Sequence, residues 1–224
     1  MPNIRNYKTL IFDCDGVILN SNFIKAKCFK ETILKFGEEH TKEFMKYNET
    51  ASGISRKEKF NYFLNEIIKK KDKRLFKKKQ LDILVSEFSK KLKISISDCE
   101  VSNYLRNLRG LNPQQNWLIV SGSDHNELQE IIKEKGLTDL FNAGIFGSLD
   151  SKLNIIKNQF LNKYIEKPVL FLGDSKLDFL TARALNIDFI FISNWTELPN
   201  WKSFCDVHKI KNIPNLSYLL KDKF

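Results

Sequence analysis

The sequence predicts an α/β protein in which an all-helical insertion interrupts a doubly wound, Rossmann-like parallel sheet. From residue 99 onward, short apolar runs alternate with amphipathic segments of helical period, which is typical of parallel strands covered by helices on both faces. Between residues 22 and 96 the pattern is helical only. We therefore expect residues 1–20 and 97–224 to form the α/β domain and residues 21–96 to form a helical domain.

The first strand and the helical insertion follow from local patterns. TLIFDC, at 9–14, is an apolar run that ends where two acids begin, which indicates a buried strand. The segment 22–37 has helical spacing and ends at Gly37, a residue that often terminates helices. Two further stretches carry apolar residues largely at steps of three and four, as on the buried side of a helix. These residues are Ile54, Phe60, Phe63, Leu64, Ile67 and Ile68, then Leu81, Leu84, Val85, Phe88 and Leu92.

The second part of the chain alternates regularly between helix and strand. Helices are predicted at 101–108, 123–136, 151–163 and 176–186, and strands at 116–122, 143–148, 167–175 and 187–193. In the tail we expect one more strand at 205–210 and a final helix near 215–224. Because this helical insertion follows the first strand, and because open α/β sheets bind ligands at the carboxyl ends of their strands, the insertion is expected to cover the site.

Composition indicates which location and which classes of partner to expect. The 224 residues contain no apolar run long enough to cross a bilayer and no secretory leader pattern, so we expect a cytoplasmic protein without a membrane partner. The formal charge is +10, but lysine is abundant along the whole chain. We interpret the densest basic run, at 69–80, as a solvated helix face, and we expect no nucleic-acid partner. The four cysteines lack metal-binding spacing and are expected to be reduced. The sequence makes no prediction of oligomeric state.

Polar residues stand where three predicted strands end, and a lysine opens a later helix. If the sheet is parallel, these residues converge on one edge of it. They are Asp13 and Asp15, Ser121 and Gly122, Asp174 with Asp178, and Lys152.

Carboxylates in this set predict a metal. Asp13, Asp174 and Asp178 would gather negative charge that a hard cation neutralises, and oxygen ligands favour Mg²⁺.

The other groups suit a phosphoryl group. Ser121 and the backbone N–H groups near Gly122 would form an anion site at a helix N-terminus, and Lys152 would add positive charge. Asp13 could then attack phosphorus to form an aspartyl-phosphate, while Asp15 could protonate the leaving oxygen and later activate water.

FDCDGV, VSGS, Lys152 and GDSKLD resemble, in this order, the four motifs of the haloacid dehalogenase (HAD) superfamily. The helical insertion is similar to that superfamily's C1 cap, of the phosphoglycolate phosphatase and β-phosphoglucomutase type, and the resemblance covers nearly the whole chain. It implies that Asp13 is the nucleophile and Asp15 the general acid/base. Superfamily members that cleave carbon–halogen or carbon–phosphorus bonds lack an acid at that second position, so Asp15 fits phosphate-ester chemistry.

The resemblance also implies ligands. Ser121 and Lys152 would hold phosphoryl oxygens. Mg²⁺ would be bound by Asp13, the backbone carbonyl of Asp15, and Asp174, with Asp178 ligating directly or through water. The implied substrate is a small phosphorylated metabolite such as a sugar phosphate or phosphoglycolate.

Some alternatives stay open. In the insertion, ASGISRKEKF resembles a segment that faces the active site in β-phosphoglucomutases, so Arg56 is a candidate for a second anionic group of the substrate; a surface arginine is the alternative. Lys157 is the alternative to Lys152 as the lysine that holds phosphoryl oxygens. Lys25 stands where the mutases have a hinge histidine, which disfavours a phosphomutase as the alternative to a phosphatase. A non-catalytic binding protein and a phosphatase of nucleic-acid ends are less favoured.

Overall fold

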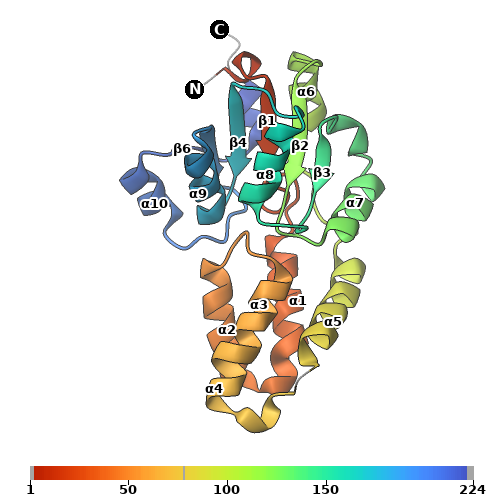
Figure 1. Ribbon diagram of the computed structural model, residues 1–224, viewed down its shortest axis with the longest axis vertical. Helices are drawn as coiled ribbons and strands as arrows, with labels where there is room; N and C mark the ends of the chain where they lie inside the picture. Colours follow the sequence, from red (N-terminus) through yellow and green to blue (C-terminus); the bar gives the residue numbers. More distant parts are fainter. Residues whose placement is uncertain (1–2, 78, 221–224) are drawn as a thin grey trace.

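The computed structural model describes residues 3–77 and 79–220. Within this part of the chain, six strands form one sheet in which every neighbouring pair is parallel, in the order β3-β2-β1-β4-β5-β6. This confirms the predicted parallel sheet, which Figure 1 shows in the upper half of the molecule. The strands are β1 (Thr9–Phe12), β2 (Asn116–Val120), β3 (Gly144–Phe146), β4 (Val169–Gly173), β5 (Asp188–Ile192) and β6 (Lys211–Ile213).

The central strand β1 is buried on both faces. All four of its residues are buried, and Leu10 lies opposite Trp117 of β2 and Leu170 of β4. Leu10 and Phe12 belong to one hydrophobic cluster and Ile11 to another, because alternate side chains point to opposite faces of a strand. The continuous apolar run TLIF is thus explained by burial on two sides.

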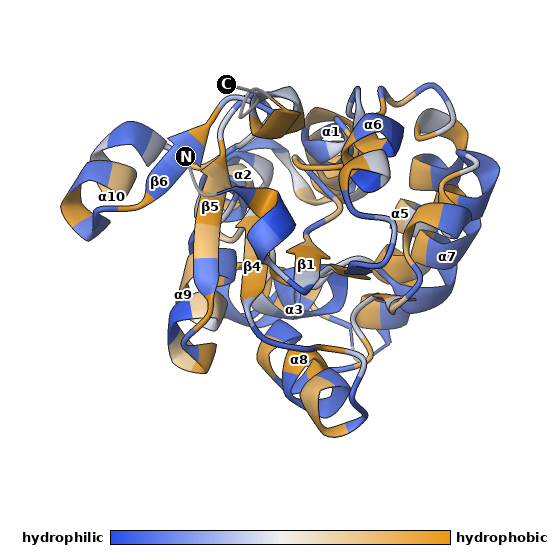
Figure 2. Cartoon of the chain, turned by 90° about the horizontal axis from the view of Figure 1, so that it is seen from above, coloured by the Kyte–Doolittle hydropathy of each residue, from blue (hydrophilic) through white to orange (hydrophobic). Residues whose placement is uncertain are grey.

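Helices cover both faces of the sheet. On the face toward Ile11, α8 (Lys152–Leu161) and α9 (Lys176–Leu185) pack through residues such as Ile156 and Ala182. On the other face, α6 (Leu105–Leu111), α7 (His125–Glu134) and a 3₁₀ segment at Leu216–Leu220 contribute to the larger cluster. Seen from above in Figure 2, the apolar strands lie between α8 and α9 on one side and α6 on the other.

A block of helices lies at the carboxyl ends of the strands, in the lower half of Figure 1. We call it the helical block. Five phenylalanines from its helices, with ring centroids 4.3–6.4 Å apart in the neighbouring pairs, form its core: Phe29, Phe44, Phe60, Phe63 and Phe88. The helices are α1 (Asn22–Ile33), α2 (Glu38–Thr50), α3 (Arg56–Tyr62), a π-helical continuation (Phe63–Ile68), α4 (Lys69–Lys71) and α5 (Gln80–Ser95).

Two adjacent stretches of chain join the helical block to the sheet. The Asn20 N–H donates to the Glu100 carbonyl at 2.9 Å, and the Ser102 N–H donates to the Ile18 carbonyl at 2.7 Å. Leu19 and Val101 form an isolated antiparallel bridge between these hydrogen bonds. The connections therefore lie side by side, as two-point attachment requires, while the domain boundaries given above stay a prediction.

The tail differs from the sequence prediction. The strand expected at 205–210 is wrong: most of this segment belongs to α10 (Trp201–His208), and β6 follows at Lys211–Ile213. Trp201, Phe204 and Cys205 share one cluster with β5 and recur at helical steps, which outweighs the short alternating pattern. The final helix is a 3₁₀ segment up to residue 220, and residues 221–224 lie outside the described part.

The described residues include no helix with the length and apolar character that a membrane span needs. The basic run at 69–80 lies around α4, at the end of the helical block away from the sheet, and its residue 78 is outside the described residues.

Candidate active site

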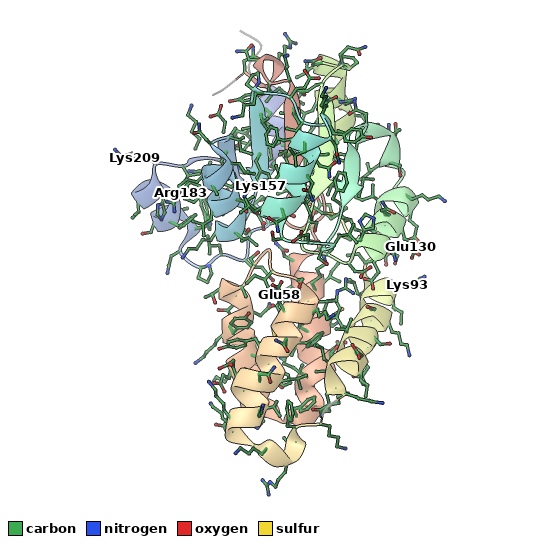
Figure 3. All side chains as sticks on the ribbon, in the orientation of Figure 1. Glu58, Lys93, Glu130, Lys157, Arg183 and Lys209 are labelled. Atoms are coloured by element: carbon green, nitrogen blue, oxygen red, sulfur yellow. The ribbon has the colours of Figure 1, made fainter. Side chains whose placement is uncertain are left out.

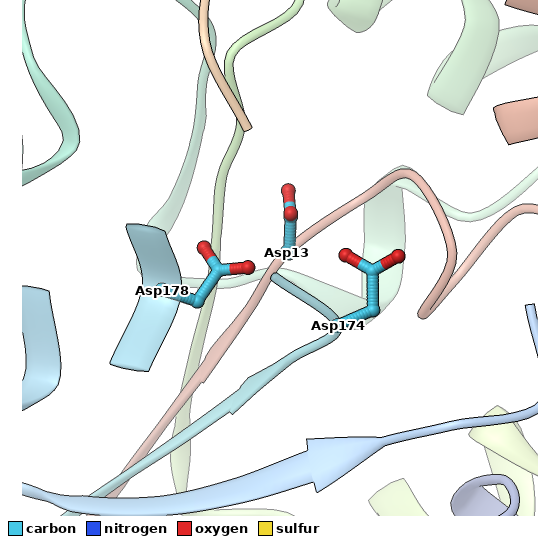
Figure 4. A group of neighbouring side chains, drawn as sticks. All are labelled: Asp13, Asp174 and Asp178. Atoms are coloured by element: carbon cyan, nitrogen blue, oxygen red, sulfur yellow. The ribbon is translucent and has the colours of Figure 1, made fainter. Parts of the chain in front are cut away.

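Three buried aspartates meet where β1 and β4 end. Asp13 directly follows β1, Asp174 directly follows β4, and Asp178 lies in the first turn of α9. One carboxylate oxygen from each lies within 4.8 Å of the others. Figure 4 shows the three carboxylates side by side. The convergence predicted from the parallel sheet is therefore present, because β1 and β4 are hydrogen-bonded neighbours.

Lys152 is the lysine at this cluster. It opens α8, is buried, and its Nζ lies 2.8 Å from Asp13 Oδ2 and 2.6 Å from Asp178 Oδ1. Burial alone would lower the pKa of the ammonium, but the charges of the two carboxylates outweigh burial and hold that pKa above its usual value. Lys157 is exposed on the same helix, where Figure 3 labels it. The structure thus places Lys152, and not Lys157, beside the aspartates.

When fully ionised, the cluster would carry excess negative charge. Burial raises the pKa of Asp13 and of Asp174 well above the usual carboxyl range, and neighbouring carboxylates raise both further. Three carboxylates face one ammonium, so a hard cation with oxygen ligands fits the charge and the donor set.

Asp178 is held by its surroundings. Its Oδ2 accepts hydrogen bonds from the Ser175 hydroxyl at 2.6 Å and the Ser175 N–H at 3.2 Å, which forms a capping box at the start of α9. Its Oδ1 accepts the bond from Lys152. Similarly, the Asn22 amide donates to Asp174 Oδ2 at 2.8 Å. These bonds fix the orientation of both carboxylates.

Asp15 lies near the three aspartates but in a different environment. Its carboxylate is paired with Lys25 Nζ at 2.6 Å and accepts hydrogen bonds from the hydroxyls of Ser123, at 2.8 Å, and Ser21. Ser121 Oγ lies 3.4 Å from it. Burial acts to raise the pKa of Asp15, but Lys25 and the hydroxyl donors outweigh it and hold that pKa below its usual value. The pKa values of Asp13 and Asp15 are therefore shifted in opposite directions, that of Asp13 upward and that of Asp15 downward.

Two glycines permit close approaches. Gly16 has a φ of +77°, and a Cβ there would overlap the carboxylate of Asp174. A Cβ at Gly122 would overlap the carbonyl oxygen of Gly53, which belongs to the helical block. The glycine after β2 thus lets the helical block touch the edge of the sheet.

Arg56 lies where the helical block meets the α/β part, and its guanidinium is bound by other side chains of the protein. Its guanidinium is 2.7 Å from Glu127 of α7, donates to Ser89 Oγ at 2.8 Å, and stacks over Phe88 at 4.8 Å from the ring centroid. The predicted substrate arginine therefore joins the helical block to the α/β part in this structure, while its side chain also lines the cavity.

A cavity of about 60 Å³ lies between the helical block and the strand ends. Asp13, Asp15 and Asp174 line it from the sheet, and Arg56 and Lys25 line it from the helical block. Among the charged and amide side chains of its lining, sequence reasoning missed four, because each depends on how the two parts meet. They are Asn22, Asn48, Lys59 and Glu197. Only Lys59 had a local signal, since it follows Arg56 by one helical turn.

Comparisons with known proteins agree with this geometry. The sequence model of the haloacid dehalogenase-like hydrolases matches residues 7–186. A predicted phosphoglycolate phosphatase from Haemophilus somnus has a TM-score of 0.73 at 15% identity, over 96% of this chain and 97% of that one.

Two further solved structures have the same fold. A predicted phosphatase from Clostridium acetobutylicum has a TM-score of 0.70 at 17% identity, over 96% of both chains. A haloacid dehalogenase-like hydrolase from Streptococcus pneumoniae has a TM-score of 0.68 at 18% identity, over 96% of this chain and 98% of that one. No curated protein matches the sequence. At these identities the solved structures establish the fold, and the family match spans most of the chain, so the protein belongs to the haloacid dehalogenase-like hydrolase family.

Proposed function

We propose that this hydrolase is a Mg²⁺-dependent phosphatase that cleaves a small phosphorylated metabolite through an aspartyl-phosphate on Asp13. The observation that carries the proposal is the position of the Asp13 carboxylate, which lies at the end of β1 within 2.8 Å of Lys152 and lines the cavity. The phosphatase names of solved structures with the same fold support it.

The metal would be held by the side chains of Asp13 and Asp174, by the backbone carbonyl of Asp15, and by Asp178 directly or through water. When bound, Mg²⁺ would neutralise the carboxylates and polarise phosphoryl oxygens. Because Ser175 and Lys152 already occupy both oxygens of Asp178, a water-mediated contact suits that residue better.

The residues of the chain divide the reaction between them. Lys152, the Ser121 hydroxyl and the Gly122 N–H hold the phosphoryl oxygens while Asp13 attacks phosphorus and the ester bond breaks. Asp15 gives a proton to the leaving oxygen, then takes one from the water that hydrolyses the aspartyl-phosphate. Since Lys25 keeps Asp15 ionised in this structure, the acid role requires Lys25 to leave Asp15, and Asp15 to take up a proton from solvent, when substrate binds.

The helical block would act as a cap. Its loop at 52–54 touches Gly122, and its residues complete the cavity wall, so substrate is shielded from bulk water during transfer. The cavity suits a small leaving group, such as a sugar or a glycolate. A phosphomutase has less support, because a lysine stands at position 25 and the matching family is one of hydrolases. Cytoplasmic location stays a prediction from the sequence.

The test is a steady-state screen of phosphorylated metabolites with released phosphate as the readout. We expect turnover with Mg²⁺, loss of turnover in EDTA and recovery on adding Mg²⁺ back. Full turnover in chelator would contradict the metal role. Dependence of turnover on a sugar bisphosphate, with no net phosphate release, would favour the mutase instead.

A further inference from the structure

The part of the cavity beyond the phosphoryl site contains a buried lysine, Lys59, that forms no ion pair with any described residue. Lys59 of α3 is 8% exposed, and its Nζ donates to Asn48 Oδ1 at 2.8 Å and lies 5.1 Å from the centre of the Phe29 ring. Burial lowers the pKa of Lys59 to about 8. Among the described residues, Asn48 is its one hydrogen-bond partner, so two of its three N–H groups are left for a ligand in the cavity.

Glu197 lines the same cavity from the other side. It lies on the loop between β5 and α10, and within residues 3–77 and 79–220 no group donates a hydrogen bond to its carboxylate. Burial raises the pKa of Glu197, and the charge of Lys59 acts against this rise. The two side chains attract each other electrostatically yet form no ion pair in the described structure. A donor and an acceptor are therefore both available to a ligand.

The remaining charges of the cavity wall are already balanced. Lys25 is paired with Asp15 at 2.6 Å, and Arg56 is paired with Glu127 at 2.7 Å. Lys59 and Glu197 carry opposite charges without forming an ion pair, so cations and anions of this region are equal in number. In the proposed reaction the phosphoryl group takes up Lys25, so a carboxylate on the leaving group would find no further cation in excess and would lie near the carboxylate of Glu197.

A hydroxyl group meets these conditions better. It can accept a hydrogen bond from an ammonium and donate one to a carboxylate at the same time, and it brings no charge. We propose that Lys59, Asn48 and Glu197 form a subsite for the hydroxyl groups of an uncharged leaving group, so that the substrate is a phosphorylated sugar or polyol and not a phosphorylated hydroxy acid such as phosphoglycolate. This inference rests on the phosphatase function proposed above.

A size-matched pair of substrates tests the proposal. We expect kcat/KM for glycerol 3-phosphate to exceed that for 3-phosphoglycerate by about tenfold or more, since hydrogen bonds to charged groups are lost with the second compound. Glu197→Gln removes the negative charge with little change of shape, and should shift the ratio of the two kcat/KM values toward the acid by about tenfold. Glu130→Gln, an equivalent change at an exposed site on α7 that Figure 3 labels, should leave the ratio unchanged.

Lys59→Met provides a second variant. It should lower kcat/KM for glycerol 3-phosphate by about tenfold or more, with a smaller effect on p-nitrophenyl phosphate, whose leaving group has no hydroxyl for the subsite. Thermal melting separates this effect from loss of fold.

The outcomes distinguish the two proposals. If the wild type fails to hydrolyse p-nitrophenyl phosphate and the whole metabolite panel with Mg²⁺, the phosphatase function is wrong. If it is active but prefers 3-phosphoglycerate, or if Glu197→Gln leaves the substrate ratio where it was, the hydroxyl subsite is wrong while the phosphatase stands.

Discussion

Replacing Lys152 with methionine should destabilise the metal-free protein strongly. Methionine keeps the length and apolar stem of the side chain but removes the charge that lies 2.8 Å from Asp13 and 2.6 Å from Asp178. All three side chains are at most 5% exposed, so solvent screens the loss little. Removing one member of a buried ion pair typically costs about 3–5 kcal/mol of unfolding free energy. We expect a loss in this range near pH 8, and a smaller one near pH 5, where protonation of the carboxylates relieves their repulsion.

The assay is urea unfolding at equilibrium in EDTA, with Lys157→Met as the matched control. Both lysines belong to α8, but Lys157 is exposed, so its replacement should change the unfolding free energy by less than about 0.5 kcal/mol. Mg²⁺ should stabilise Lys152→Met more than the wild type, because the variant leaves more uncompensated negative charge. Equal losses in the two variants would refute the reasoning, since they would show that the buried lysine does not neutralise the aspartates.

Three other predictions follow from the same site. Asp13→Asn should abolish turnover while far-UV circular dichroism stays unchanged; measurable turnover would contradict the nucleophile assignment. In EDTA the unfolding free energy should fall as pH rises from about 4 to 8, because the raised pKa values of Asp13 and Asp174 make the folded state bind more protons than the unfolded chain. Asp15, whose pKa is lowered, does not change this slope, since its stabilisation is already complete above about pH 4. An unfolding free energy that stays constant with pH in urea melts would oppose this. Gly122→Ala should displace the Gly53 carbonyl and lower kcat/KM by about tenfold or more, since small misplacements at a closing lid are costly; an unaltered kcat/KM would show that this contact is unimportant.

The positions of the residues at the strand ends could be derived from the sequence for a physical reason. In a parallel sheet, the residue after each strand is carried to one edge whatever the rest of the chain does, so Asp13, Ser121 and Asp174 could be placed from strand ends alone. Lys152 could be chosen over Lys157 only from the motif order, and the structure shows why the helix start matters: it directs Nζ between two carboxylates.

The helical block was predictable as helices that cover the strand ends, but most of the polar residues with which it lines the cavity were not. The cavity brings together Asn22, Lys59 and Glu197 only because the block lies against the strand ends. The local sequence pattern around each residue gives no indication of this contact. The prediction of a strand at 205–210 was wrong for a related reason. It used only a short alternating pattern, which contains no information on the packing of Trp201 against Phe191, whose ring centroids are 5.9 Å apart.

Ion pairs across the boundary between the helical block and the α/β part join the two walls of the cavity. Lys25 and Arg56 of the helical block each pair with an acid of the α/β part, and both pairs are largely shielded from solvent. The exposed pair of Lys93 and Glu130, which Figure 3 labels at the edge of the boundary, is looser at 3.8 Å and contributes little. The two shielded pairs hold the block against the strand ends, and the Lys25 pair also occupies Asp15, the acid/base group of the proposed reaction. In the proposed reaction, substrate must therefore compete for Lys25, and the contact that holds the two parts together would keep Asp15 from acting as acid or base until a phosphoryl group binds.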